Sequence, residues 1–279
     1  MNGSMLCAVC LTADEVRLMD QAIGLYFCGR CRHAFTPRPK HQQEVYEESY
    51  YLEKHPNWFA NPNYPFFEYL RKKIEHYLPK GKRARLMDAG HGTGDLLKYL
   101  DQKNANLDLT GIDSLKMEHP RIHFIQGDFF QDTAKEPYDV VTSLMVVEHV
   151  NDPRSFAKKM YEYLVPGGLL MISTNNNDSL IYVIGRLLKP LGVRVVFDRV
   201  YSDHHLQHFT NASLRRLLEN HGFEILELRN HNYPLKAVDT PPAGPIVTKM
   251  YLAAVWVLFR VSEILGNGFF QTYVCRKKA

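Results

Sequence analysis

The chain has 279 residues, of which 45% are hydrophobic and 23% are charged, and its formal net charge at pH 7 is +4. These values exclude a disordered chain, and so small a charge does not by itself indicate nucleic-acid binding. The first residues, MNGSMLCAVC, lack the apolar stretch of a secretory signal, so we expect a cytoplasmic protein. The length suits one good-sized domain with a small appendage.

Four of the five cysteines form two pairs near the N-terminus, with two residues inside each pair and 17 residues between the pairs. Each Cys-x-x-Cys turn directs two thiolates at one ion, and two such turns complete a tetrahedron. The spacing therefore predicts a structural zinc ribbon over residues 1–40, with no open position for catalysis and with the ligands Cys7, Cys10, Cys28 and Cys31. A redox pair is the alternative, whereas disulfides are not expected in the cytoplasm.

Residues 41–84 form an aromatic-rich, helical bridge that begins after the two prolines of TPRPK (36–40). A helix is expected to begin at Pro65, because proline suits a first helical turn and an apolar stripe follows it. The bridge suits a lid over a ligand, a platform for a sugar ring, or simple packing on the next domain. The aromatic residues concerned are Tyr46, Tyr50, Tyr51, Trp58 and Phe59.

Strands and helices alternate through the third region, residues 85–279. Strand patterns occupy 84–90, 106–113, 122–128, 138–146 and 166–174, and helix patterns occupy 93–103 and 152–165. This alternation predicts an α/β fold with a parallel sheet and helices on both faces, in which ligands bind beyond the carboxyl ends of the strands. After an insertion at 176–207, the sequence predicts a helix at 210–222, a long apolar helix at 246–265 and two closing strands.

The stretch LMDAGHGTGDLL (86–97) predicts a strand that turns sharply on Gly90, Gly92 and Gly94 and continues as a helix. A dinucleotide-binding loop needs a glycine where this chain has Asp95, whose carboxylate would repel a pyrophosphate. The loop better suits a cofactor that has no phosphate and carries positive charge. S-adenosylmethionine (SAM) has a sulfonium and an ammonium, and loop N–H groups can bind its carboxylate.

Acidic residues end three successive predicted strands: Asp88, Asp113 and Asp128. A carboxylate at the end of the second strand can accept hydrogen bonds from both ribose hydroxyls. Asp128 can accept one from an adenine amino group, with the ring of Phe129 beside the base. Because strand ends often carry Asp as a turn residue, only the three acids together indicate a site.

These motifs, with YDVVTSLMVVEHVNDP (138–153) and LVPGGLLMIST (164–174), resemble the class I SAM-dependent methyltransferases over roughly residues 65–279. The resemblance implies a Rossmann-like, mostly parallel seven-stranded sheet with one antiparallel edge strand. It also implies a cofactor site made of Asp88, Gly90, Gly92, Gly94, Asp113, Asp128, Phe129 and Leu144. A zinc ribbon ahead of such a domain resembles enzymes of saccharide and natural-product pathways.

Methyl transfer to a hydroxyl needs a base, and histidine suits that role near neutral pH. EHV (148–150) places His149 at the mouth of the expected cleft, unless Glu148 only caps the next helix. DHHLQHFT (203–210) contains His205 and His208, which we narrowly favour over His149 because the resemblance places this segment over the cleft.

A metal site within DHHLQHFT is a weaker interpretation. Ubiquinone-pathway O-methyltransferases, which use a divalent metal, have a further acid where this chain has Met145, which argues against a catalytic metal.

The stretch SLIYVIGRLLKPLGVRVVFDRV (179–200) mixes apolar residues with four basic ones. We favour a cap over the acceptor pocket, and peripheral contact with anionic lipid or a lipid-linked acceptor is the alternative. The longest apolar run, YLAAVWVLF (251–259), is too short to span a bilayer.

The favoured function is O-methylation from SAM of a saccharide or related small metabolite, free or lipid-linked, with a histidine as general base. Ribosomal-RNA methylation is the first alternative, because some such enzymes also carry an N-terminal zinc finger. Sugar C-methylation and SAM binding without turnover are the others. The sequence gives no indication of the oligomeric state.

Overall fold

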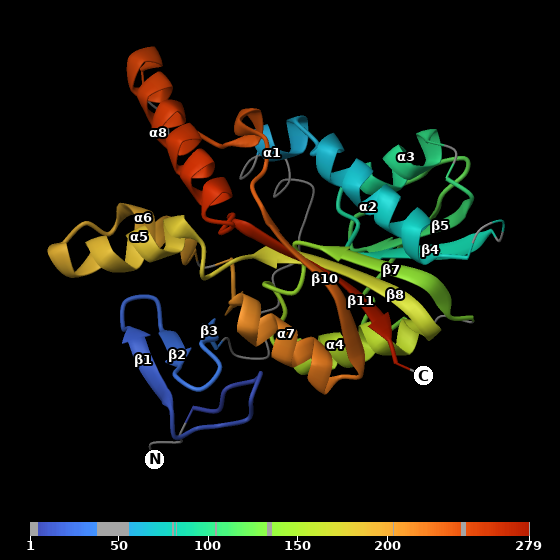
Figure 1. The fold of residues 1–279 in the computed structure, drawn as a ribbon, viewed down its shortest axis with the longest axis horizontal. Helices are drawn as coiled ribbons and strands as arrows, with labels where there is room; N and C mark the ends of the chain where they lie inside the picture. Colours follow the sequence, from blue (N-terminus) through green and yellow to red (C-terminus); the bar gives the residue numbers. More distant parts are fainter. Residues whose placement is uncertain are drawn as a thin grey trace.

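The computed structural model describes residues 5–37, 56–79, 81, 83–103, 105–132, 136–202, 204–240 and 244–278. Two sheets organise these residues (Figure 1). The larger sheet has seven strands and carries helices on both faces. The smaller sheet has four strands, three of them from the N-terminal cysteine-rich segment. Tyr46, Tyr50 and Tyr51 of the expected aromatic lid lie outside the described residues.

The large sheet confirms the predicted Rossmann-like fold, with strand order β10-β11-β8-β7-β4-β5-β6. Its only antiparallel strand is β11, which lies one position in from the edge, between β8 and the edge strand β10. The remaining neighbours pair in parallel. The strands are β4 (Ala84–Ala89), β5 (Leu107–Asp113), β6 (His123–Gln126), β7 (Tyr138–Leu144), β8 (Leu164–Asn175), β10 (Phe223–His231) and β11 (Phe270–Lys277).

Two helices cover each face of this sheet (Figure 1). On one face α2 (Tyr64–Tyr77) and α3 (Asp95–Gln102) pack their leucines and Phe67 against Leu86 and Val140. On the other face α4 (Pro153–Tyr163) and α7 (Asn211–Asn220) pack against Met87 and Val141. Because successive residues of β4 and β7 point to opposite faces, the same strands serve both layers. The helix predicted from Pro65 is α2, and it belongs to the core of the sheet domain.

The N-terminal segment forms β1 (Val16–Asp20), β2 (Leu25–Cys28) and β3 (Ala34–Phe35), which pair antiparallel. The fourth strand of this small sheet, β9 (Gln207–His208), is distant from the other three in the sequence. It pairs Ala34 with His208 and Phe35 with Gln207. The cysteine-rich segment is therefore joined by backbone hydrogen bonds to the end of the acceptor-side insertion.

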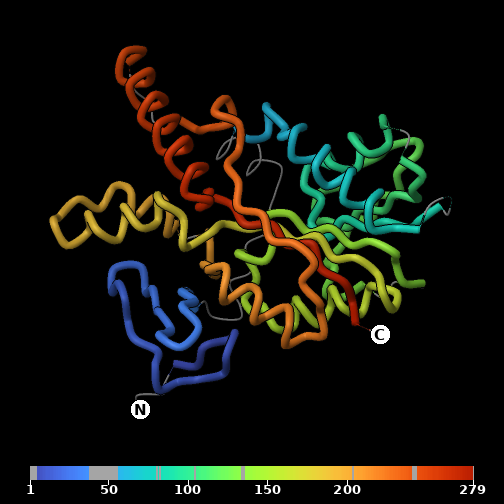
Figure 2. Tube along the Cα trace, in the orientation of Figure 1, coloured from blue at the N-terminus to red at the C-terminus, as the bar shows by residue number. Residues whose placement is uncertain are grey.

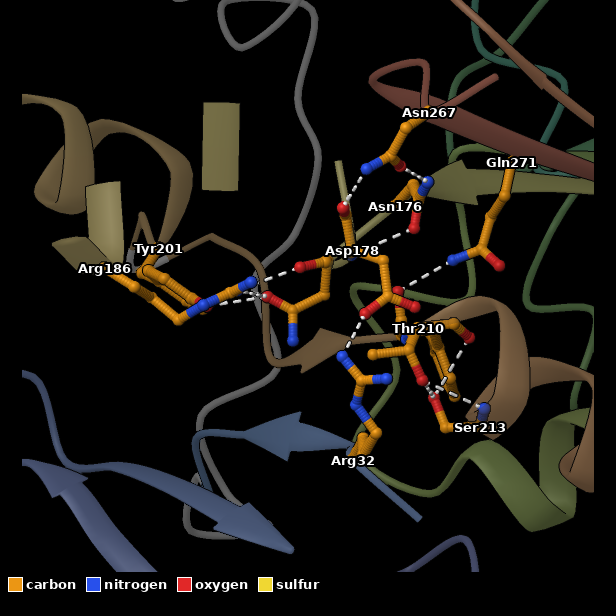
Figure 3. A network of polar contacts seen from close by, with 11 residues as sticks. Arg32, Asn176, Asp178, Arg186, Tyr201, Thr210, Ser213, Asn267 and Gln271 are labelled. Carbon is orange, nitrogen blue, oxygen red and sulfur yellow. Dashed lines mark hydrogen bonds and ion pairs between the residues drawn. The ribbon is translucent and has the colours of Figure 1, made fainter. Parts of the chain in front are cut away.

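A polar network strengthens the same junction (Figure 3). Arg32 of the N-terminal segment donates to Asp178 at 2.9 Å, and Asn267 donates to the backbone oxygen of Asp178 at 2.5 Å. Gln271 on β11 donates to the backbone oxygens of Asn175 and Phe209. These contacts link the small sheet, the insertion and the central sheet.

The remaining helices lie around the carboxyl ends of the parallel strands. They are α1 (Pro56–Ala60), α5 (Leu180–Leu188), η2 (Lys189–Leu191), α6 (Val195–Val200), η3 (Leu235–Ala237) and α8 (Pro245–Ile264). The α5–α6 unit and α8 project from the same side of the central sheet (Figures 1 and 2).

Helix α8 confirms the long apolar helix predicted between the two closing strands. It has 20 residues and a mean hydropathy of 1.3, and only 11% of that apolar stretch is buried. Within the described residues it is the one helix long and apolar enough to cross a membrane. By itself, the apolar run at residues 251–259 is too short to span a bilayer, as the sequence predicts. The helix is longer than that run, because apolar residues continue on both sides of it.

Candidate active site

The glycine loop joins β4 to α3 with a left-handed backbone. Gly90, Gly92 and Gly94 have φ values of +78°, +53° and +72°. A Cβ on Gly90 would lie 2.5 Å from Cγ2 of Val146, and one on Gly94 would lie 2.9 Å from the ring of Phe124. Both conformation and space therefore require glycine, which brings the loop backbone close to a ligand.

We expect Gly90→Ala to destabilise the protein by about 2–3 kcal/mol and to weaken SAM binding, because backbone strain and the clash with Val146 add. Gly192→Ala is the matched control, since Gly192 has a φ of +84° but a Cβ placed there would meet nothing within 4 Å. Thermal unfolding and SAM titration calorimetry measure both variants. Equal losses in the two would show that the clash with Val146 contributes nothing.

The acids at the strand ends reach one cavity of about 1450 Å³ together with the glycine loop. Asp113 accepts a hydrogen bond from the N–H of Gly92 at 2.9 Å, which ties the loop to β5. Asp128 accepts one from the N–H of Phe130 at 2.8 Å, which fixes its turn. The predicted cofactor residues on the cavity wall are Asp88, Gly90, Gly92, Asp113, Asp128, Phe129 and Leu144, whereas Gly94 is the N-cap residue of α3.

Asp88 is the most buried of these acids, with 3% of its surface exposed. Its carboxylate accepts a hydrogen bond from the Thr142 hydroxyl at 2.6 Å. Burial raises the pKa of Asp88 to about 7, and the hydrogen bond from Thr142 opposes that rise. A carboxylate held in so poor a solvent favours a nearby cation.

We expect Asp88→Asn to stabilise the protein relative to wild type more at about pH 8 than at about pH 5. The pKa of the Asp88 carboxyl is higher in the folded protein than in the unfolded chain, so folding takes up a proton between about pH 4 and pH 7. Wild-type stability therefore falls across that window, and the extra gain of the variant is about 2 kcal/mol. Chemical unfolding at both pH values measures it, and a pH-independent difference would contradict it. SAM affinity should fall in the same variant, about tenfold.

His149 and His205 face each other on the cavity wall, with ring centroids 4.9 Å apart. Nδ1 of His149 lies 2.8 Å from the backbone oxygen of His204. A carbonyl oxygen only accepts hydrogen bonds, so Nδ1 carries the proton and Nε2 of the neutral ring carries the lone pair. Nδ1 of His205 lies 3.2 Å from Nδ2 of Asn175. In this tautomer Nε2 of His149 is the ring nitrogen that can accept a proton.

Glu148 lies behind this pair, fully buried, where sequence patterns suggested only a helix cap. The N-cap of α4 is Asp152, whose side chain accepts from the N–H groups of Arg154 and Ser155. Glu148 instead accepts from the Thr174 hydroxyl at 2.8 Å, and burial raises its pKa to about 7. Glu148 was missed as a site residue because only the tertiary fold brings it close to His205 and Thr174, although it directly precedes His149.

One ligand atom each from Glu148, His149 and His205 lies within 4.8 Å of the others. This set offers one carboxylate and two imidazoles to a single divalent ion. Met145, the position at which metal-dependent relatives have an acid, lines the cavity. Asp203, the first residue of DHHLQHFT, lies outside the described residues.

His208 does not belong to the site, which corrects the sequence-based preference. Its ring is 1% exposed and lies against Tyr182 and Tyr201, and it is absent from the cavity wall. Burial lowers its pKa to about 3, so the ring stays neutral in the core of the small sheet. Both residues of β9 are buried, because this strand lies between the N-terminal segment and the central sheet domain.

Beyond the histidines, one part of the cavity wall is rich in aromatic side chains. Trp58 of α1 packs edge-to-face on Tyr233 and Phe270, with ring centroids 5.2 and 5.6 Å apart. Trp58 and Phe59, both expected from the sequence, line the cavity. The sequence did not predict the wall contributed by the C-terminal elements, which comprises His231, Tyr233, Tyr251, Val255, Phe259, Phe269 and Phe270.

The four paired cysteines converge in the N-terminal segment. Their sulfur atoms lie within 4.8 Å of one another, and the contacts Cys7–Cys31 and Cys10–Cys28 are both 3.5 Å. A tetrahedral zinc with bonds of about 2.3 Å places its sulfurs about 3.8 Å apart, so the cluster fits that ion. Each knuckle closes on a backbone hydrogen bond, from Leu11 to Cys7 and from Arg32 to Cys28.

The parallel sheet, the glycine loop and the strand-end acids define a class I SAM-dependent methyltransferase. The family described as "Methyltransferase domain" matches residues 64–228, and the chain belongs to that family. The protein is thus an enzyme of the methyl-transfer class with SAM as its cofactor.

Curated relatives include ubiquinone biosynthesis O-methyltransferases. The one from Rickettsia canadensis is 26% identical over 60% of this chain and 74% of its own length. The one from Aeromonas salmonicida is 30% identical over 53% of this chain and 66% of its own length. Another, from Chelativorans, is matched over 60% of its length.

Solved structures show the same fold at low identity. The 1,6-didemethyltoxoflavin-N1-methyltransferase from Burkholderia thailandensis superposes with a TM-score of 0.54 and 13% identity, covering 95% of this chain and all of that one. The plantazolicin methyltransferase BpumL gives a TM-score of 0.52 and 16% identity, covering 83% and 89%.

Proposed function

We propose that the protein transfers the methyl group of SAM to a hydroxyl on an acceptor that has an apolar portion. The observation that carries this proposal is the single cavity that runs from the glycine loop past His149 and His205 to an aromatic wall. The histidines provide the base that an oxygen nucleophile needs, and the aromatic wall binds apolar surface. The relatives named for O-methylation support an oxygen acceptor.

In this mechanism the protein mainly positions the two reactants. The glycine loop and the strand-end acids would hold SAM, with the buried carboxylate of Asp88 favouring its positive charge. SAM would supply the electrophilic methyl group and leave as a neutral thioether, and Nε2 of His149 would take the proton of the acceptor hydroxyl. The hydrogen bond from Nδ1 of His149 to the His204 carbonyl oxygen stabilises the imidazolium that forms.

Two lines of evidence bear on the chemical class of the acceptor. The sequence favoured a saccharide, whereas the curated relatives are named for ubiquinone biosynthesis and not for saccharide methylation. Aromatic faces suit both a sugar ring and a hydrocarbon, and the apolar side chains of Val255 and Phe259 on α8 and of Ile181 and Val200 on the α5–α6 unit add surface for a hydrocarbon. We therefore propose a lipid-linked acceptor, whose methylated head group is a saccharide or another small hydroxyl compound.

A metal-assisted variant of the mechanism is supported by the Glu148, His149 and His205 cluster. These residues would hold a divalent ion, which would lower the pKa of a bound acceptor hydroxyl. Elemental analysis of wild type and of a His205→Ala variant tests this. A second metal per chain, lost in the variant while zinc remains, would support metal assistance, whereas zinc alone in both supports His149 acting as a simple base.

We also propose that the four-cysteine cluster binds structural zinc, as its sulfur geometry supports. With four protein ligands the ion has no open position, so it would fix the ribbon and take no part in methyl transfer. A cytoplasmic location, which the sequence favours, would keep these thiols reduced.

The experiment that tests the proposed function follows label from methyl-labelled SAM into host extract. RNA, lipid-linked material, polysaccharide and small polar metabolites are then separated. Label in the lipid-linked fraction, absent with a His149→Asn variant, is the expected result. Label in RNA or in free polysaccharide would overturn the acceptor assignment.

A further inference from the structure

Helix α8 has an outer face that is mostly apolar and also exposes Lys249, Arg260 and Glu263. Its inner face, with Tyr251, Val255 and Phe259, lines the acceptor half of the cavity. The large apolar side chains exposed on the other face are Ile246, Val247, Met250, Trp256, Val257, Val261 and Ile264, the last of these with 85% of its surface in solvent. A helix that is apolar all round is ordinarily covered, so this face indicates a partner.

The α5–α6 unit presents a second apolar surface on the same side of the molecule (Figure 1). Its tip exposes Leu187, Leu191, Val193 and Val195, with Leu191 76% exposed. Ile181 and Val200 of the same unit line the cavity that α8 lines from the other side. The acceptor half of the cavity is thus lined by two elements that also carry exposed apolar surfaces.

Charge distinguishes a lipid bilayer from a second copy of the chain as the partner. Cations exceed anions in these two elements: Arg186, Lys189, Arg194, Arg199, Lys249 and Arg260 against Asp198 and Glu263. Asp20 of the ribbon neutralises part of this excess through Lys189 and Arg194, at 2.6 and 2.8 Å. The remaining positive charge would repel its own copy and attract anionic headgroups.

The fold also determines how α8 would meet the bilayer. Because its inner face forms the cavity wall, α8 cannot cross the membrane without dismantling that wall. Trp256 is half exposed, and Arg260 stacks over its ring at 5.7 Å, a combination suited to the headgroup region. An interfacial position, with the apolar face inserted and the cations at the headgroups, satisfies both constraints.

We propose that α8 and the tip of the α5–α6 unit dock the enzyme on an anionic lipid bilayer, with the cavity opening toward the lipid. The purpose of this docking, which is to let the acceptor enter the cavity from the membrane, rests on the proposed function. The docking surface itself is independent of methyl transfer.

Co-sedimentation of the full chain with vesicles of phosphatidylcholine and phosphatidylglycerol tests the proposal, with no acceptor present. We expect wild type to bind, and a Met250→Ser, Val257→Ser, Val261→Ser variant to bind about 30-fold more weakly. A Leu6→Ser, Leu18→Ser variant is the matched control, because these exposed leucines lie on the ribbon and should not affect binding. Binding should weaken on pure phosphatidylcholine.

Unchanged melting temperature and SAM affinity in the triple variant would show that its loss is local. Equal vesicle binding by wild type and triple variant, or no binding by wild type, would overturn the proposal. A wild-type dimer in light scattering that the triple variant converts to monomer would assign the face to a second copy instead. If vesicles bind as expected but no lipid-linked product is labelled, the docking surface stands and the acceptor assignment fails.

Discussion

His149→Asn is expected to lower kcat between about a hundredfold and ten-thousandfold while SAM affinity stays within about twofold of wild type. The asparagine amide can still donate to the backbone oxygen of His204, which Nδ1 of His149 contacts at 2.8 Å. The loop therefore keeps its anchor, and the variant loses only the lone pair of Nε2. Single-turnover methyl transfer and SAM calorimetry separate the two effects.

His205→Asn is the matched comparison for that experiment, since His205 shares the cavity wall with His149. If His149 is the base, the His205→Asn variant should retain more activity than His149→Asn. In that case the ring of His205 in the wild-type protein binds the acceptor but does not take the proton. An equal collapse of kcat in both variants would instead agree with a shared metal held by the Glu148, His149 and His205 cluster. Full activity in His149→Asn would exclude His149 as the base.

Local sequence patterns were sufficient for the fold because they reflect local physics. The glycine run predicted the strand–turn–helix at β4 and α3, since left-handed backbone and close packing leave no other residue type. The alternation of apolar segments predicted the parallel sheet and its helices. The position of β11 next to the edge was not accessible in this way, because it depends on how the two closing strands pair across an inserted helix.

The acceptor half of the site was only partly predictable, because its residues meet through tertiary contacts. Glu148 and Thr174 are 26 residues apart in the chain, and no motif links them. His208 was chosen for its neighbours in sequence, but in the fold it is buried against Tyr182 and Tyr201. The aromatic wall comes from elements around β10, α8 and β11, and no local motif joins these segments.

The contacts between the ribbon and the loop that carries Glu148 and His149 could not be predicted from the sequence either. Gln207 connects the two parts, because its side chain contacts Nε2 of His33 at 2.9 Å and donates to the backbone oxygen of Val150 at 3.0 Å. The backbone oxygen of Glu148 accepts from the N–H groups of Leu206 and Gln207. The segments that carry His149 and His205 are thus held between the ribbon and the central sheet, so we expect the ribbon to position them, although none of its described residues lines the cavity.

Cys28→Ser is therefore expected to abolish binding of the proposed zinc and to lower methyl transfer at least about a hundredfold, although the four cysteines do not line the cavity. Without zinc the β2–β3 knuckle loses its anchor, and β9 and the loop that carries His205 lose their partner strand. SAM affinity should change little, because β4, β5 and the glycine loop make no strand pairing with the ribbon. Zinc content, SAM calorimetry and single-turnover rates measure the three consequences.

Two further variants distinguish loss of positioning from general unfolding. Cys275→Ala changes a cysteine buried in β11 outside the cluster, so zinc content and kcat should remain near wild type despite some loss of stability. Gln207→Leu keeps all four cysteines but removes both polar contacts of the side chain, and we expect full zinc content with a roughly tenfold lower kcat. Wild-type kcat in a zinc-free Cys28→Ser protein would show that the ribbon does not position His149 and His205.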